Sequence, residues 1–457
     1  MDVLDLTRLQ FAVVTIYHYL FVPLSISLSA TTAGLQIAWM RTGQDRYRQL
    51  TLLVGKLLIV TFAVGVVTGL VQEFQFGLAW SEFARFYGDV FGPTLAIEGM
   101  LAFFLEATFL ALWYFGWDRL SRGVHLATIV VVAVGTLLSA FIILAGNSFM
   151  QHPVAFELDP ATGRAHLTSF RELLLNEVNL AAFPHTTAGA VMVGGALLLA
   201  IGAWRAAAGT PDRQAFITLA RLGAWMTAAG GALTAVTGDH LGKVITQVQP
   251  MKMAAAEALY ATTTGAPFSL FAVGPDFSIE VPRLLSILAY GSPDATVAGI
   301  DDLQAQYSAA YGPGSYIPMV PVAFWSFRLM IGAGMLAMLF AVLYLWRTRR
   351  GRQPAAWLVR GALLLPLLPS AANSLGWIFT ETARQPWIAF GLSKVADGIS
   401  PGLTSGEVLA SLLGFAAVYG VLAVVWLRLV RHLARKPLSP PASDERAAAE
   451  PEPALSY

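Results

Sequence analysis

A few ionisable side chains lie inside long apolar stretches of this sequence. They include His18, Glu98, Glu106, His185, Arg328 and Glu381. Each costs on the order of 2.5–3.5 kcal/mol or more in a hydrocarbon environment, so each suggests a function. Imidazole and thioether groups can ligate haem iron, and carboxylates on one helix can relay protons. A membrane Arg needs an anionic partner, such as a haem propionate or a carboxylate.

Every one of these residues also has an ordinary structural interpretation. A membrane His taken alone is as often a hydrogen-bonding residue as a ligand, and Met330 alone is more often a packing residue. Glu98 and Glu106, about 80° apart around an α-helix, could form structural hydrogen bonds or a proton relay. Glu381 could lie at the membrane interface. These residues alone indicate a membrane redox or proton-handling protein, with a proton-coupled transporter as the alternative.

The composition predicts the elements that must position these side chains. Of the 457 residues, 56% are hydrophobic and 12% are charged, against roughly 25% charged in an ordinary soluble domain. We therefore predict an all-α integral membrane protein, a single bundle of nine transmembrane helices. The spans lie at roughly 11–40, 51–77, 92–116, 124–149, 180–204, 216–237, 319–346, 356–380 and 405–430. Cysteine is absent, which excludes thiolate ligands, and the net charge of +1 suggests no nucleic-acid partner.

Basic residues alternate between the loops and predict the orientation of the bundle. They follow the first, third, fifth, seventh and ninth spans: Arg41, Arg46, Arg48, Arg119, Arg122, Arg205, Arg213, Arg347, Arg349, Arg350, Arg352, Arg428, Arg431, Arg435 and Lys436. We therefore expect the N-terminus outside and the C-terminus in the cytoplasm. In that orientation His18, Glu98, His185 and Glu381 lie in the outer part of the membrane. Glu106 lies about 12 Å further in than Glu98.

The same pattern divides the chain into four segments. Residues 1–237 are expected to hold helices 1 to 6, residues 238–318 an outer loop, and residues 319–436 helices 7 to 9. Residues 437–457, rich in Pro, Ala and Glu, are expected to form a disordered cytoplasmic tail. The loop begins with "GDHLGKVITQVQPMKMAAAEA", a chargeable and amide-rich segment in an otherwise apolar chain.

Six motifs together resemble subunit I of cytochrome bd quinol oxidase. Besides the segment above they are "RLQFAVVTIYHYLFVPLSI", "GPTLAIEGMLAFFLEATF", "GNSFMQHPV", "WSFRLM" and "GWIFTETARQPW". The resemblance runs from the first span to the end of the ninth. It implies a respiratory enzyme of the bacterial cell membrane that reduces O2 to water with electrons from a membrane quinol. It also implies a low-spin haem b and two high-spin haems, one haem b and one haem d.

The resemblance also assigns roles to individual residues. It implies that His185 and Met330 are the axial ligands of the low-spin haem b, and that Arg328 balances the charge of that haem. It implies that His18 and Glu381 ligate the two high-spin haems, His18 being generally the ligand of haem d. Glu98 belongs to the same site. Trp377 resembles the aromatic residue placed between haems, and Arg384 completes its motif, although Ala383 stands where the family usually has Gly.

The polar segment matches the quinol-binding loop, in its shorter form. Lys252 and Glu257 are the residues that the family assigns to quinol. A carboxylate can accept the protons that quinol oxidation releases, while a Lys can bind the substrate oxygen. Glu106 and Glu98 would carry cytoplasmic protons to the oxygen site, so that charge is separated across the membrane without a pump.

Partners and alternatives complete the prediction. The resemblance implies a separate subunit II and leaves room for a small single-span subunit. A transporter would use Glu98, Glu106 and His18 without a cofactor, and a haem anchor would need only His185 and Met330. A cyanide-insensitive relative would carry a third haem b in place of haem d. Neither that choice nor the choice between ubiquinol and menaquinol can be made from these residues.

Overall fold

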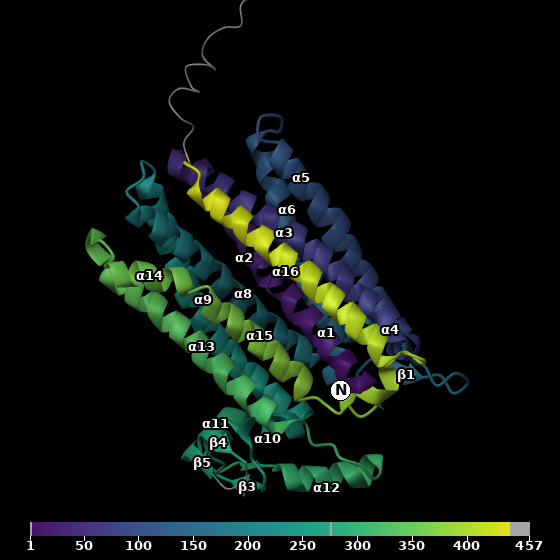
Figure 1. The fold of residues 1–457 in the computed structure, drawn as a ribbon. Coiled ribbons are helices and arrows are strands. Elements are labelled where there is room, and N and C mark those ends of the chain that lie inside the picture. Colours follow the sequence, from purple (N-terminus) through teal and green to yellow (C-terminus); the bar gives the residue numbers. More distant parts are fainter. Residues whose placement is uncertain (1, 275–276, 439–457) are drawn as a thin grey trace, which may run out of the picture.

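Nine helical stretches cross the molecule side by side (Figure 1). The computed structural model describes residues 2–274 and 277–438. Within them, the helices long and apolar enough to span a membrane are Val3–Thr42, Asp45–Leu78, Ser81–Phe115, Arg122–Gln151, Glu177–Ala207, Arg213–Val248, Val320–Arg347, Ala356–Thr382 and Ser405–Arg435. The prediction of nine spans is confirmed. Of the predicted disordered segment, residues 439–457 lie outside the described residues.

Three of these spans consist of more than one helix. The first is α1 (Val3–Tyr19) and α2 (Val22–Thr42), the third is α4 (Ser81–Gly99), a π-helix η1 (Met100–Glu106) and α5 (Ala107–Phe115), and the eighth is α14 (Ala356–Leu364) and α15 (Leu367–Thr382). Pro23 lies in the first turn of α2 and Pro366 caps α15, positions where the missing N–H of Pro is tolerated. The other spans are α3 (Asp45–Leu78), α6 (Arg122–Gln151), α8 (Glu177–Ala207), α9 (Arg213–Val248), α13 (Val320–Arg347) and α16 (Ser405–Arg435).

The connections contain short helices and four two-stranded antiparallel sheets. The sheets pair β1 (Phe156–Leu158) with β2 (Ala165–Leu167), β3 (Thr263–Thr264) with β6 (Thr296–Val297), β4 (Phe268–Val273) with β5 (Phe277–Val281), and β7 (Trp387–Ala389) with β8 (Ser393–Lys394). The helices are α7 (Phe170–Leu174), α10 (Pro250–Glu257), α11 (Leu284–Tyr290), α12 (Ile300–Tyr311), η2 (Arg349–Gly351) and η3 (Val395–Gly398).

The long loop begins later than the sequence predicts. Residues 238–248 are not loop but the last turns of α9, which ends at Val248. Val244 and Ile245 pack there against Val178 and Ala181 of α8, so an apolar face continues past the polar residues of this segment. The sequence boundary at 237 was placed by mean hydropathy, which misses a helix that is apolar on one face only.

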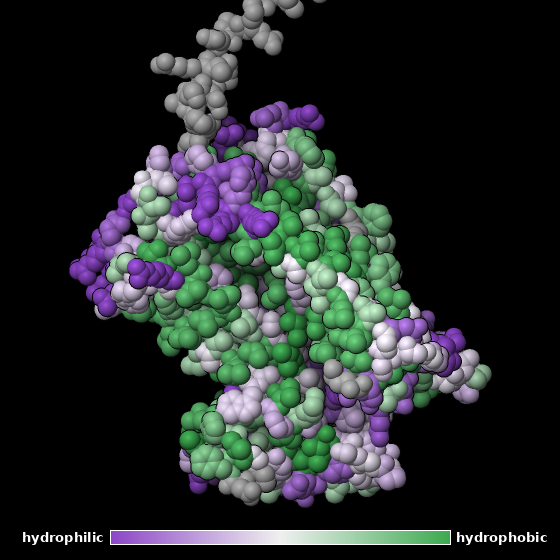
Figure 2. All heavy atoms as spheres, viewed as in Figure 1, coloured by the Kyte–Doolittle hydropathy of each residue, from purple (hydrophilic) through white to green (hydrophobic). Residues whose placement is uncertain are grey.

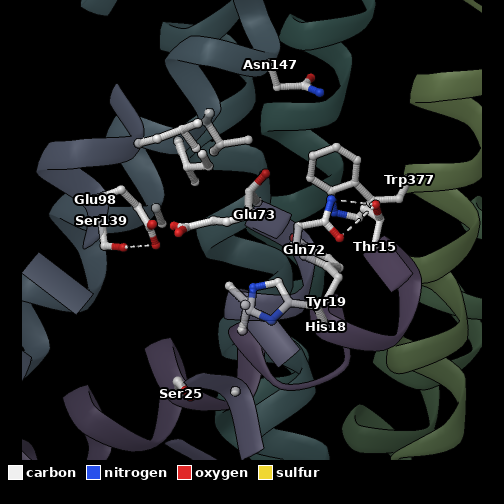
Figure 3. Close-up of a pocket in the computed structure, with 18 of the residues that line it drawn as sticks. Thr15, His18, Tyr19, Ser25, Gln72, Glu73, Glu98, Ser139, Asn147 and Trp377 are labelled. Carbon is white, nitrogen blue, oxygen red and sulfur yellow. Dashed lines mark hydrogen bonds between the residues drawn. The ribbon is translucent and has the colours of Figure 1, made fainter. Parts of the chain in front are cut away.

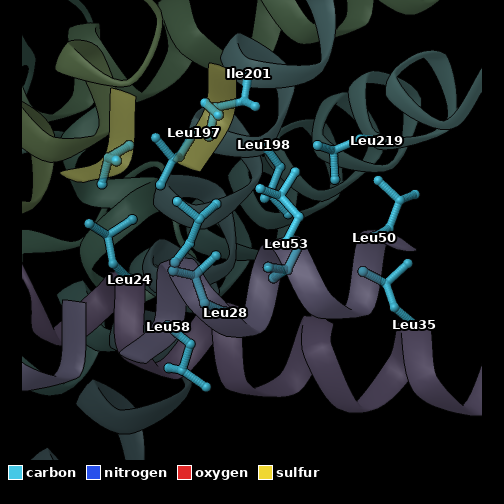
Figure 4. Packing of buried hydrophobic residues seen from close by; sticks show 14 of the residues in the cluster. Leu24, Leu28, Leu35, Leu50, Leu53, Leu58, Leu197, Leu198, Ile201 and Leu219 are labelled. Atoms are coloured by element: carbon cyan, nitrogen blue, oxygen red, sulfur yellow. The ribbon is translucent and has the colours of Figure 1, made fainter. Parts of the chain in front are cut away.

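Small residues let the central pair of helices pack closely. A Cβ added at Gly195 of α8 would lie 2.6 Å from the backbone nitrogen of Thr227, and one at Gly223 of α9 would lie 2.3 Å from that of Leu199. Such contacts are typical of membrane helix interfaces, where close backbone approach replaces the hydrophobic effect. Beside this pair, leucines of α2, α3 and α8 form a buried cluster (Figure 4).

The surface agrees with a bilayer around the bundle. Apolar side chains cover the middle of the face in Figure 2, and polar side chains gather towards the ends. In Figure 1 the connections that carry the predicted cytoplasmic Arg residues lie at the end opposite α10 and α12. The alternation of basic loops is therefore consistent with the fold.

Candidate functional site

Two neighbouring cavities hold nearly all of the predicted site residues. The first, which we call the carboxylate cavity, has a volume of about 240 Å³ and is lined by His18, Glu73, Glu98, Glu106 and Glu381, among others. The second, the His185–Met330 cavity, has a volume of about 470 Å³ and is also lined by Lys252 and Glu257.

His18 enters the carboxylate cavity from the last turn of α1 (Figure 3). Its Nδ1 lies 3.0 Å from the hydroxyl oxygen of Thr68, and that hydroxyl donates to the backbone carbonyls of Val64 and Gly65. When the hydroxyl proton is bonded to one of these carbonyls, Nδ1 carries its own proton and donates to Thr68. The lone pair of Nε2 makes no hydrogen bond within the described residues, and this is the tautomer in which Nε2 can bind a metal.

Glu98 and Glu106 face the same helix, α6. The Glu98 carboxylate accepts a hydrogen bond of 3.1 Å from Ser139, and a Cβ added at Gly135 would lie 3.3 Å from Cγ of Glu106. The sequence prediction of an 80° separation is wrong, because it assumed a regular α-helix. The π-helix η1 between them has more residues per turn, so it rotates Glu106 towards α6.

Glu73 is a cavity residue that the sequence analysis missed. It projects from α3 into the carboxylate cavity and points towards Glu98 (Figure 3). Residue 73 falls near the end of the predicted span 51–77, and a carboxylate in that position is normally assigned to the membrane interface. In the fold it follows Gly69 by four residues on α3, and a Cβ added at Gly69 would lie 3.1 Å from His18, so the packing of α1 against α3 brings Glu73 near the imidazole.

Both oxygens of Glu381 are held by hydrogen bonds. Asn147 of α6 donates to Oε1 at 2.7 Å, and Arg384 donates to Oε2 at 2.5 Å. Arg384 is buried, and its Nε and Nη1 have no partner among the described residues. An anionic group at this site would satisfy them.

His185 and Met330 line the second cavity from α8 and α13. His185 Nδ1 lies 3.1 Å from the Thr234 carbonyl, which can only accept, so Nδ1 is protonated and the lone pair of Nε2 is open. A Cβ at Gly238 would lie 3.0 Å from Cε1 of His185, and one at Gly376 would lie 3.0 Å from Sδ of Met330. The two glycines leave each side chain room beside the neighbouring helix.

Lys252 lies on α10, deep in the second cavity. It is 2% exposed, and its Nζ donates to Gln151 at 2.7 Å and to the Thr380 carbonyl at 2.9 Å. Burial lowers the pKa of Lys252 to about 7, with Arg384 adding to the effect and Glu381 opposing it. This amine can therefore gain or lose a proton near neutral pH.

Glu257 ends α10 and pairs with Arg328. The Arg328 Nη2 lies 2.5 Å from Glu257 Oε2, and Glu257 is 1% exposed. Burial raises the pKa of Glu257 to about 7, against the opposing effect of Arg328. The anionic partner expected for Arg328 is thus a carboxylate. Glu257 Oε1 and Arg328 Nη1 are both buried without a partner within the described residues.

The two cavities share a wall. Trp377 of α15 lines both and packs edge-on against Tyr19, with ring centroids 5.2 Å apart. The other shared lining residues are Tyr19, Leu144, Asn147 and Thr186. These features define a class of protein: a multi-pass α-helical membrane protein whose adjacent internal cavities present single imidazole, thioether and carboxylate donors.

Comparisons with known proteins identify the family. Residues 6–438 match the family model described as cytochrome bd terminal oxidase subunit I. The chain is 40% identical to cytochrome bd ubiquinol oxidase subunit 1 of Bacillus subtilis over 93% of this chain and 92% of that protein. It is 34% identical to cytochrome bd-II ubiquinol oxidase subunit 1 of Escherichia coli, over 95% and 96% of the two chains.

A solved structure agrees with these sequence relatives. The bd oxidase from Geobacillus thermodenitrificans superposes with a TM-score of 0.86 at 28% sequence identity, covering 95% of this chain and 99% of that chain. The chain belongs to the cytochrome bd terminal oxidase subunit I family. It is the catalytic subunit I of a respiratory terminal oxidase of the cytoplasmic membrane, as the sequence motifs predicted. The family carries haem, and a subunit I works with other oxidase subunits.

Proposed function

We propose that this subunit oxidises a membrane quinol beside the His185–Met330 cavity and reduces O2 in the carboxylate cavity. One observation carries the proposal. The residues expected to oxidise quinol line one cavity, those expected to reduce O2 line the other, and Trp377 lines both. Electrons would pass between the two halves across this shared wall.

The donors fit haem in both cavities. His185 and Met330 would hold a low-spin haem b. His18 and Glu381 would each hold one high-spin haem, of which one would be haem b and the other haem d or a third haem b. The open Nε2 atoms of the two histidines and the partnerless nitrogens of Arg328 and Arg384 support this assignment. Bound haem would supply one-electron redox chemistry in both cavities and O2 binding in the carboxylate cavity.

Lys252 and Glu257 would bind and deprotonate the quinol. A general base works best when its pKa is near the working pH, and the pKa of Glu257 at about 7 meets that condition. Deprotonated Glu257 would accept a hydroxyl proton, while protonated Lys252 would donate a hydrogen bond to the oxygen on which charge develops. Arg328 would hold the Glu257 carboxylate in place.

Glu106 and Glu98 would pass protons along α6 to the O2 site, and Glu73 extends this row of carboxylates. With the predicted orientation, N-terminus outside, quinol protons leave at the outer face and oxygen-site protons come from the cytoplasm. Each charge separated in this way stores about 2.3 kcal/mol per 100 mV of membrane potential.

Reduced-minus-oxidised spectra of the purified complex, with haem extraction, test the proposal. We expect three haems per complex, one low-spin, and a chlorin-type band if one is haem d. One haem alone would support the electron-anchor alternative and contradict the proposal. Family membership already excludes the proton-coupled transporter.

A further inference from the structure

The hairpin formed by β4 and β5 is apolar although it lies outside the nine spans. Its exposed apolar side chains are Leu270, Phe271, Val273, Phe277, Ile279 and Val281. Glu280 is the one charged residue on these two strands, and it accepts a hydrogen bond from Ser278. Water would solvate such a surface poorly.

The neighbouring helix α11 extends this surface. It exposes Ile287, Leu288 and Tyr290, which together with the exposed apolar residues of β4 and β5 we call the hairpin patch. In Figure 2 apolar side chains cover the lower left of the molecule, where Figure 1 shows β4, β5 and α11. Contiguous exposed apolar surface of this kind marks a contact with a membrane or a protein.

The hairpin lies beside a membrane span rather than beyond its end. Arg328 Nε donates to the Ser269 carbonyl of β4 at 2.5 Å, and the Phe271 ring packs edge-on against Trp325 with centroids 5.1 Å apart. Trp325 and Arg328 belong to the second and third turns of α13, about 8 to 12 Å from its start. Strand β4 therefore reaches the depth of those turns.

The patch continues the lipid-facing side of α13. Leu329, Leu336 and Leu339 of that helix are each more than half exposed. In a multi-pass membrane protein such leucines face acyl chains. The contact between Phe271 and Trp325 joins the hairpin to this helix.

The backbone limits how deep the hairpin can lie. A two-stranded sheet has two free edges, and their unpaired N–H and C=O groups are too costly for the hydrocarbon centre. The boundary between headgroups and acyl chains suits them, because apolar and aromatic side chains enter the acyl region there while the backbone stays hydrated.

A second hairpin shows what a water-facing equivalent looks like. The β1–β2 hairpin carries Glu157 and His166 on its strands, and Asp159 and Arg164 beside them. It lies at the same end of the bundle as β4 and β5 (Figure 1). The two hairpins thus share a location but differ in chemistry.

We propose that the hairpin patch rests in the headgroup–acyl boundary of the lipid bilayer. The same elements supply Phe268, Leu285 and Leu288 to the wall of the His185–Met330 cavity. A quinol dissolved in the membrane would therefore approach Lys252 and Glu257 beside the patch. This last step rests on the proposed function, whereas the lipid contact does not.

Spin labelling tests the contact directly, because the sequence contains no cysteine. A nitroxide would be attached to Ile279→Cys in the intact oxidase complex, reconstituted in phospholipid vesicles. Leu158→Cys on the β1–β2 hairpin is the matched control, since Leu158 is 49% exposed and Ile279 is 53% exposed. The unsubstituted complex, treated in the same way, gives the background from other subunits.

We expect O2, which concentrates in acyl chains, to relax the label at 279 several-fold more than a water-soluble nickel chelate does. The label at 158 should show the reverse. A label at 279 that responds mainly to the chelate would overturn the proposal, and so would one shielded from both reagents, which would indicate a covering protein. Phe277→Cys repeats the measurement if Ile279→Cys does not fold. A failed quinol assignment would leave the label data unchanged, so the two ideas are tested separately.

Discussion

The two cavities share a wall but hold charge in different ways. Four glutamates line the carboxylate cavity, and Arg384 holds one of them, Glu381. The buried acid and the buried amine of the His185–Met330 cavity are Glu257 and Lys252, each bonded to a different partner. Asp239 also lines this cavity, but it is exposed and pairs with Lys243. A surplus of carboxylates suits a site that collects protons. A buried acid and a buried amine, each with a pKa of about 7, suit a site that takes protons from one substrate.

Removing the thioether of Met330 should have the largest effect, because it should alter one cavity and leave the other unchanged. In Met330→Leu the low-spin signal should be lost or converted to high-spin, while the high-spin signals of the carboxylate cavity remain. Loss of a residue that only hydrogen-bonds a metal ligand typically costs about 10–100-fold in activity. Loss of the ligand itself should therefore lower oxidase activity by at least that much. Spectra and haem extraction of the purified complex measure both effects. Met335→Leu, on the same helix and lining the same cavity, is the control, and a normal low-spin signal in Met330→Leu would refute the ligand assignment.

Glu257→Gln should stop quinol oxidation without emptying either cavity of haem. Loss of a general base lowers rates by about 10²–10⁴-fold, and here the variant also leaves Arg328 without its anion. We expect kcat/KM for quinol to fall by that amount while the haem spectrum is retained. Glu177→Gln, exposed at the start of α8, is the control. A drop in haem content equal to the drop in activity would show a structural role instead.

The pH profile of the unaltered enzyme sharpens this prediction. Glu257 must be deprotonated to act, so quinol oxidation should rise with pH through its pKa of about 7. Lys252 must be protonated, so the rate should decline as pH rises through its pKa of about 7. The expected profile of kcat/KM is a narrow bell near pH 7. In Glu257→Gln the acidic limb should disappear, and its persistence would assign that limb to another group.

Glu106→Gln should slow turnover and leave both quinol affinity and haem content unchanged. The carboxylate is buried beside α6, so an amide fits the space but cannot carry a proton. Oxygen uptake measured with excess quinol should fall about tenfold or more. Glu82→Gln, a carboxylate at the start of the same span that pairs with Arg85, provides the control. Unchanged oxygen uptake would remove Glu106 from the proton path.

The sequence predicts much of this molecule because lipid imposes simple rules. The length of the apolar stretches located all nine spans. The motifs that contain His18, His185, Met330 and Glu381 identified the correct family. What the sequence could not supply is local geometry. The π-helix that turns Glu106 towards α6 has no signature in the residue pattern, and hydropathy placed the end of α9 too early.

Contacts between side chains on different helices could not be predicted from the sequence either. Glu73 meets Glu98, and Glu257 meets Arg328, only because segments distant in sequence pack together. A list of ionisable residues finds the members of such pairs but not the pairing. For Arg328 the chemistry predicted a carboxylate or a propionate, and only the fold selects Glu257.

Two glycines offer the finest test of the difference between the cavities. In Gly69→Ala a new methyl group would lie 3.1 Å from His18, and in Gly238→Ala it would lie 3.0 Å from His185. These contacts are tight enough to tilt one imidazole without filling a cavity. We expect Gly69→Ala to shift only the high-spin bands and Gly238→Ala only the low-spin bands, with activity changed a few-fold.

Matched variants separate this effect from a general loss of helix flexibility. Gly65→Ala and Gly242→Ala lie on the same two helices, and their nearest neighbours would be 3.8 and 4.0 Å away, which is ordinary contact. Both should leave the spectra unchanged. If Gly69→Ala and Gly238→Ala instead shifted the same band, His18 and His185 would serve one haem, and the division into two cavities would be wrong.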